Sequence, residues 1–159
     1  MTTQPAPVAA IHHVALVTHD AQNLSAWYRD LLGFEHRWTL TAFSELTRRR
    51  LPGIQKIEEL RLGDFRIHLL EVPSAGPSTP VVHTANYQHL CLVLRSPEEL
   101  RELRDRWEEK SRGGRYSFRT DPDLTDIVVD SDGVHSFYAF DPDGLEWEFT
   151  CIPAGSEGR

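Results

Sequence analysis

The feature that most constrains the fold of this 159-residue chain is an internal repeat with a spacing of 76 residues. IHHVALVTH, which begins at Ile11, and YQHLCLVLR, which begins at Tyr87, both alternate like β-strands, and apolar residues at helical spacing follow each of them. This match without gaps predicts a duplicated structural unit. The matched pairs are His13 and His89, Asp20 and Ser96, Leu24 and Leu100, Trp27 and Leu103, and Leu31 and Trp107.

The residues around the repeated helices predict where those helices begin and end. Asp20 stands at the N-cap position of the first helix, and Gly33 closes it. Ser96 is the equivalent cap of the second helix, where Pro97 occupies the first helical position and Glu99 completes a capping box. Each half therefore starts as a strand followed by a helix.

Three further strands are expected after each helix. They are FEHRWTLT, KIEELRLG and FRIHLLEV in the first half, and RYSFRT, HSFYAFD and LEWEFTCI in the second. The ends of the halves match at a spacing of 80, with His68 against Glu148 and Pro73 against Pro153. We predict an α+β fold of two βαβββ modules that form a cupped mixed-sheet barrel with the helices outside.

Punctuation by Pro, Gly and Ser sets the expected domain boundaries. We expect residues 1–10 to be a disordered N-terminus, residues 11–153 a single domain, and residues 154–159 a flexible tail. Within the domain, module one covers 11–73, a connector covers 74–86, and module two covers 87–153. AFSELTRRRLPG is expected to be an insertion in module one that contains a short helix.

Composition excludes several classes of function. The 17 Lys and Arg against 24 Asp and Glu give a net charge of −7, which argues against nucleic-acid or membrane partners and favours a small-molecule substrate. No apolar stretch suits a signal peptide or a membrane span, so a cytoplasmic location is expected. Cys91 and Cys151 are too few for a disulfide framework, and we expect both to be buried apolar fillers.

Strand alternation turns four polar residues toward the same concave surface. If the helices cover Val14, Leu90 and their same-parity neighbours, then His13, His68, His89 and Glu148 face away from them. Polar groups that converge inside a sheet must be paired, hydrated or metal-bound, because an unpaired neutral group costs on the order of 2–7 kcal/mol. One divalent metal ion per chain would satisfy all four residues. The alternative is four unrelated polar residues.

Imidazole and carboxylate ligands suit Fe, Mn, Co, Ni or Zn. Two histidines with one carboxylate and open positions form the ligand set of non-haem Fe(II) oxygenases, which favours Fe(II) here. His12 has the opposite strand parity, so we interpret it as a structural residue or a neighbour of the ligands.

The motifs around these residues resemble the vicinal oxygen chelate superfamily, which includes glyoxalases, bleomycin-resistance proteins and extradiol dioxygenases. The resemblance rests on IHHVALVTHDAQNLSAWYRDLLGF, YQHLCLVL and FYAFDPDGLEWEF and extends from Ile11 to about Ile152. By position it implies that His13, His89 and Glu148 are metal ligands. His68 falls where glyoxalase I has a ligand Glu. It also implies a homodimer, since such proteins commonly pair the edges of their sheets.

The resemblance leaves several reaction classes open. Tyr138 lies ten residues before Glu148, as in part of the extradiol dioxygenase signature, although the upstream His of that signature is missing. Our first hypothesis is therefore a dioxygenase with Tyr138 as a hydrogen-bond donor, against the alternative of a core tyrosine. The second is an isomerase, epimerase or lyase, with His68 as a fourth ligand or a base. The third is a resistance protein that sequesters its ligand without turnover.

Arg48, Arg49 and Arg50 form a basic run in the expected insertion. The run would suit an anionic substrate such as a phosphate ester. Its alternative interpretation is a solvated surface.

Overall fold

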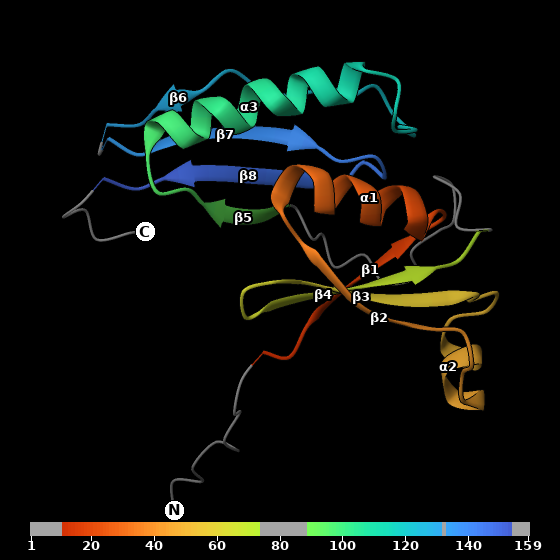
Figure 1. Cartoon of the computed structure of the whole chain (residues 1–159). Coiled ribbons are helices and arrows are strands. Elements are labelled where there is room, and N and C mark those ends of the chain that lie inside the picture. The colour runs from red at the N-terminus through yellow and green to blue at the C-terminus, as the bar shows by residue number, and fades with distance from the viewer. Residues whose placement is uncertain (1–10, 74–88, 132, 154–159) are drawn as a thin grey trace, which may run out of the picture.

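The computed structural model describes residues 11–73, 89–131 and 133–153, and it contains two similar modules (Figure 1). Each module has a four-stranded sheet, with the order β1-β4-β3-β2 in module one and β5-β8-β7-β6 in module two. The first strand pairs parallel with the last one in both sheets, and the other neighbours are antiparallel. The predicted βαβββ repeat is confirmed. The elements are β1 (Val14–Thr18), α1 (Ala21–Leu32), β2 (Glu35–Leu40), α2 (Glu45–Arg50), β3 (Lys56–Leu62), β4 (Phe65–Glu71), β5 (His89–Val93), α3 (Pro97–Arg112), β6 (Val128–Val129), β7 (His135–Phe140) and β8 (Glu146–Cys151).

The predicted caps set the ends of the long helices. The Asp20 side chain accepts a hydrogen bond from the Asn23 backbone N–H, and that of Ser96 accepts one from Glu99. Gly33 ends α1 with φ 75°, a left-handed conformation that favours glycine. Helix α2 lies within the expected insertion.

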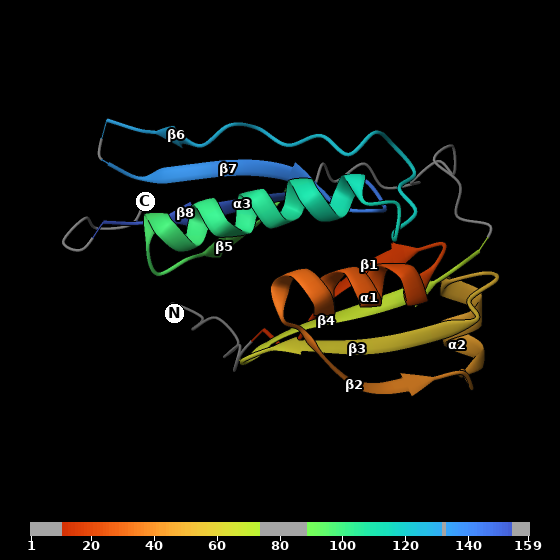
Figure 2. The same cartoon turned by 45° about the horizontal axis from the view of Figure 1, so that its top comes forward.

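The core lies where the two long helices meet the sheets. Trp27 of α1 and Trp107 of α3 are fully buried, and their rings pack edge to face with centroids 5.0 Å apart. Figure 2 shows α1 and α3 on the same side of the sheets. The sheets stay separate and share no strand pairing in the described residues. Ile67 and Leu69 of β4 are fully buried on the helix side, so His68 between them lies on the face opposite the helices.

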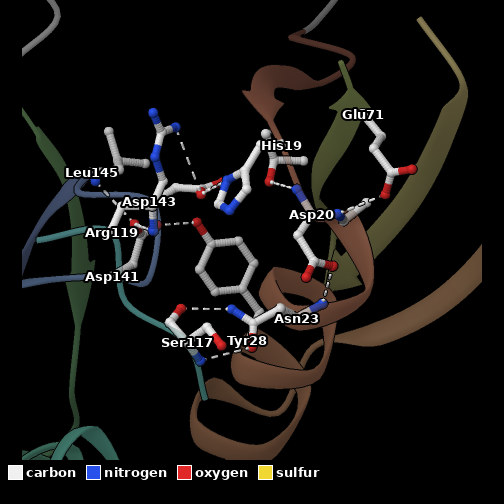
Figure 3. A network of polar contacts seen from close by, with 12 residues as sticks. His19, Asp20, Asn23, Tyr28, Glu71, Ser117, Arg119, Asp141, Asp143 and Leu145 are labelled. Carbon is white, nitrogen blue, oxygen red and sulfur yellow. Dashed lines mark hydrogen bonds and ion pairs between the residues drawn. The ribbon is translucent and has the colours of Figure 1, made fainter. Parts of the chain in front are cut away.

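A buried polar network joins the modules (Figure 3). The Tyr28 hydroxyl of α1 donates a hydrogen bond of 2.5 Å to Asp141, in the turn between β7 and β8. The same carboxylate accepts the backbone N–H groups of Asp143 and Leu145, so it shapes the turn that leads into β8. His19, just after β1, lies 2.8 Å from the Asp143 carboxylate. These contacts connect module one to the strand that carries Glu148.

One predicted strand is wrong. RYSFRT is not a strand, and the second strand of module two is instead the two-residue β6. The reason lies in the junction: Tyr116 and Phe118 pack edge to face on Trp27, and the Ser117 backbone bonds to Asn23 of α1. The segment is used to bind the other module, so it does not join the sheet. The expected N-terminal segment, connector and tail lie outside the described residues, as do residues 87 and 88 at the expected start of module two.

Candidate metal centre in two halves

Half-site one is a row of side chains across sheet A, the sheet of module one, on the face opposite α1. The strand register places Ala15, His68, Glu59 and Trp38 side by side on β1, β4, β3 and β2. His13 immediately precedes β1, and its ring stacks on that of His68, with centroids 3.7 Å apart and planes 14° apart. The structure therefore brings together the two module-one residues of the predicted site.

Glu59 is the residue of this half that the sequence reasoning missed. It is 2% exposed, and its carboxylate lies 3.0 Å from His68 Nε2 and 2.9 Å from Arg61 Nε. Burial alone would raise the pKa of Glu59, but hydrogen bonds from His68 and Arg61 outweigh it and hold that pKa below its ordinary value. An ionised Glu59 requires His68 to donate through Nε2–H, which leaves Nδ1 without a proton in the neutral ring.

His12 lies beside this pair, as predicted for a neighbour of the ligands. The side-chain nitrogens of His12, His13 and His68 fall within 4.8 Å of one another. Arg66 Nη1 lies 3.0 Å from His12 Nε2, which must accept from it, so His12 donates from Nδ1 to His13 Nδ1 at 2.8 Å. Burial lowers the pKa of His13, and the electrostatic influence of the neighbouring His68 and His12 side chains lowers it further, which favours the neutral, ligand-competent ring.

Half-site two occupies the equivalent face of sheet B, the sheet of module two. His89 Nε2 lies 3.1 Å from one oxygen of Glu148, and the Tyr138 hydroxyl donates to the other oxygen at 3.1 Å. His89 Nδ1 is buried and has no hydrogen-bond partner, since the nearest carboxylate oxygen, on Glu146, is 3.8 Å away. Burial and the Glu148 charge raise the pKa of Tyr138, so its hydroxyl remains a donor.

Cys91 belongs to half-site two, which corrects its expected role as a buried filler. It is exposed and pairs in register with Glu148, whereas Cys151 is buried as expected. Partial desolvation and the Glu148 carboxylate raise the pKa of the Cys91 thiol to about 12. The thiol is therefore protonated at neutral pH and is a poor metal ligand in that form.

The two halves do not meet within the described part of one chain. His13 and His68 form one group, His89 and Glu148 form another, and no strand of sheet A pairs with one of sheet B. A groove of about 450 Å³ lies elsewhere, between the end of α1 and the start of α3, and none of the predicted site residues line it.

The side chains of both halves fit a divalent metal. His68 presents Nδ1 because Glu59 holds its other nitrogen, and His89 presents a buried nitrogen that nothing satisfies. Unsatisfied buried polar atoms are rare, and a carboxylate behind a ligand histidine is typical of metal sites. Three imidazoles and one carboxylate also suit first-row divalent ions.

The sequence model of the Glyoxalase/Bleomycin resistance protein/Dioxygenase superfamily matches residues 10–149. The chain belongs to this superfamily. Its fold resembles that of a glyoxylase/bleomycin resistance protein/dioxygenase domain from Frankia sp. EAN1pec, with TM-score 0.70 and 16% identity over 94% of this chain and 96% of that one. No curated protein matches the sequence.

Two further solved members of the fold have named activities or ligands. Lactoylglutathione lyase from Agrobacterium tumefaciens is 24% identical, with TM-score 0.58 and coverage of 92% of this chain and 96% of that one. The fosfomycin resistance protein FosX from Listeria monocytogenes, solved with Mn(II) and sulfate, is 17% identical, with TM-score 0.62 and coverage of 93% and 94%. Like them, this chain is a member of a superfamily that contains metalloenzymes. The described helices include none long and apolar enough to cross a membrane.

Proposed function

We propose that this chain is a divalent-metal-dependent enzyme whose small substrate chelates the metal through two adjacent oxygen atoms. His13, His68, His89 and Glu148 would hold the ion. The observation that carries the proposal is the orientation of His68, whose Nε2 is held by buried Glu59 and whose Nδ1 is left for a ligand bond. When bound, the metal would supply Lewis-acid polarisation of a substrate oxygen.

We further propose that each site combines half-site one of one protomer with half-site two of a second. The halves are complementary, because the first is rich in imidazole and the second carries Glu146 and Glu148. β1 and β5 are edge strands, and they expose Val17 (50%) and Val93 (64%) on the histidine-bearing faces. Exposed apolar edges favour pairing with another copy, and a two-fold dimer would complete two sites at once.

The reaction class that the geometry favours is isomerisation, elimination or addition by a lyase-like mechanism. A fourth protein ligand at His68 leaves less room for dioxygen beside a chelating substrate. Glu146 lies on the same face as Glu148 but has no hydroxyl donor of its own, so it is a carboxylate available to move a substrate proton. Tyr138 keeps its proton and would hold Glu148 in place.

A dioxygenase is the second candidate, because the Tyr138 hydroxyl lies within hydrogen-bond distance of Glu148, where that hypothesis requires a donor. Purified protein loaded anaerobically with Fe(II) and given catechols or 2-oxo compounds separates the candidates. Oxygen uptake tied to substrate loss would favour the dioxygenase, and conversion without oxygen the isomerase or lyase. Binding without conversion would overturn both in favour of sequestration.

Mixing two inactive variants tests the shared site. His13→Ala and Glu148→Ala should each lose the metal, yet their heterodimer contains one intact site made from His13 of one copy and Glu148 of the other. Random exchange of an equal mixture should restore about a quarter of the wild-type metal content. No recovery, although heterodimers form, would place the site within one chain. A strict monomer that binds metal would overturn the dimer itself.

A further inference from the structure

We infer that the substrate carries a phosphate group, which is bound by Arg48, Arg49 and Arg50 at the far end of half-site one. This inference rests on the proposed function, because it names the substrate class of the same site. Three observations support it: the arginines are unpaired, they lie on the histidine-bearing side of sheet A, and an exposed apolar stripe connects them to His68.

The lack of partners sets these arginines apart from most cations of the chain. All three are exposed on α2, and among the residues that the structure describes none of their guanidinium groups has a hydrogen bond or ion pair. On α3, by contrast, Arg101, Arg104 and Arg112 each pair with a glutamate on the same helix. In a chain of net charge −7, three adjacent unpaired arginines create a local positive field without a counter-ion.

The position of α2 places this charge on the side of sheet A that carries the candidate site. Figures 1 and 2 show α2 on the side of sheet A away from α1, which is the side that carries His68. Between them runs a stripe of exposed apolar side chains. Trp38 (38% exposed) contacts the His68 ring with centroids 5.0 Å apart, Leu40 (44%) lies two residues along β2, and Leu46 (55%) lies on α2 beside the arginines.

This order of surfaces describes an elongated ligand. Its chelating end would reach the metal at His13 and His68, its apolar middle would lie on Trp38, and its phosphate would meet the arginines. Arginine suits phosphate because its planar fork donates two parallel hydrogen bonds to the oxygens. The class that fits is a small organic phosphate with two adjacent oxygens at the opposite end.

The test uses the full-length protein without metal, so that its outcome does not depend on the metal site. Inorganic pyrophosphate is titrated by calorimetry at low salt into wild type, into the triple variant R48Q R49Q R50Q, and into the control R29Q R106Q K110Q. The control removes the same charge from α1 and α3. The side chains of Arg29, Arg106 and Lys110, like those of the α2 arginines, have no hydrogen bond or ion pair in the described part of the chain. We expect the α2 variant to bind about tenfold more weakly and the control to bind like wild type.

A second measurement, the quenching of Trp38 fluorescence by charged ions, tests whether the positive charge of the α2 arginines extends to Trp38. Trp27, Trp107 and Trp147 are fully buried, so quenching by dissolved ions reports mainly on Trp38. We expect the α2 variant to lose about half of its quenching by iodide and to gain quenching by caesium, with the control unchanged.

Equal weakening in both triple variants would mean a net-charge effect and overturn the proposal. The proposal would also be overturned if wild type did not bind pyrophosphate, or if the quenching of Trp38 were the same in wild type and in the α2 variant. If these fail while the mixed variants recover metal, the substrate class is wrong and the metal-dependent function stands. If pyrophosphate binds as expected but the protein never binds a metal, the phosphate site stands and the metal-dependent function is wrong.

Discussion

Half-site one and half-site two occupy equivalent positions on two equivalent sheets, yet they present different chemistry. His13 matches His89 in the repeat, but His68 stands where module two has Glu148. In module one, the carboxylate is instead that of Glu59 on the neighbouring strand β3, which lies opposite His68 and contacts it. In module two, the carboxylate is that of half-buried Glu148 itself, and the Tyr138 hydroxyl on the next strand donates to it.

The difference shows how a duplicated unit can divide the work of one site. The strand register keeps each predicted ligand position, whereas the residue beside it on the next strand determines which atom is left for a ligand bond. Half-site one is a set of oriented imidazoles, and half-site two is an acidic pair with one histidine. In half-site one the carboxylate of Glu59 is already held by His68 and Arg61, and half-site two has a single histidine, which is why we expect the two halves to act together.

Removing the ligands one at a time gives the largest expected effect. We expect His13→Ala, His89→Ala and Glu148→Ala to weaken Mn(II) or Zn(II) binding at least about 100-fold. His68→Ala should weaken it to a similar extent if four ligands act together. Calorimetry and elemental analysis of protein purified without chelator check this. Strong metal retention by His68→Ala alone would restore the three-ligand hypothesis and, with it, the dioxygenase.

Weakening the polar contact between the modules tests whether that contact stabilises the fold without positioning the predicted ligands. Tyr28→Phe removes the buried donor to Asp141, which should lower the free energy of unfolding by about 2 kcal/mol. Chemical denaturation measures this loss. Metal affinity should change little, because neither residue touches either half-site. A large fall in affinity would mean that the junction positions the ligands directly.

The same variant has a pH signature. Burial raises the pKa of Asp141, and the Tyr28 hydrogen bond opposes that rise. Between its unfolded and raised folded pKa, the folded chain holds a proton that the unfolded chain has released, so stability falls as pH increases. Removing the Tyr28 hydroxyl should raise the folded pKa of Asp141 further, so the pH range over which stability falls should extend to higher pH. The destabilisation of Tyr28→Phe should therefore be larger at pH 7 than at pH 4.

Most of the fold was predictable because its signals are local. Caps such as Asp20 and Ser96 act within a few residues of the helix ends that they set. The 76-residue repeat is visible by comparing two segments of the same sequence. The strand at RYSFRT was wrong because aromatic residues favour both strands and helix-packing surfaces. Only the contact with Trp27 decides between the two, and that contact lies far away in the sequence.

For the candidate site, the sequence predicted which face of each sheet carries the residues but not how far apart the two groups lie. Alternation placed the four predicted ligands on the faces opposite the helices, where the structure has them, yet their separation follows from how α1 and α3 pack, which no local pattern encodes. Glu59 could have been found. The two-residue turn Gly63-Asp64 pairs Leu62 with Phe65, and that register sets Glu59 opposite His68.

Glu59 also provides the finest test of the comparison between the halves. Glu59→Gln keeps the shape of the side chain but replaces the carboxylate that orients His68, so metal affinity should fall about tenfold, less than on loss of a ligand. Glu146→Gln is the matched control, because Glu146 is the carboxylate beside His89 in half-site two, yet it lies 3.8 Å from His89 Nδ1, beyond hydrogen-bond distance. It should leave metal affinity nearly unchanged and reduce turnover instead, as expected for a group that moves protons. Measuring both constants in both variants separates the roles. If Glu146→Gln loses metal as strongly as Glu59→Gln, the two carboxylates are equivalent supports, and the difference that we draw between the halves is wrong.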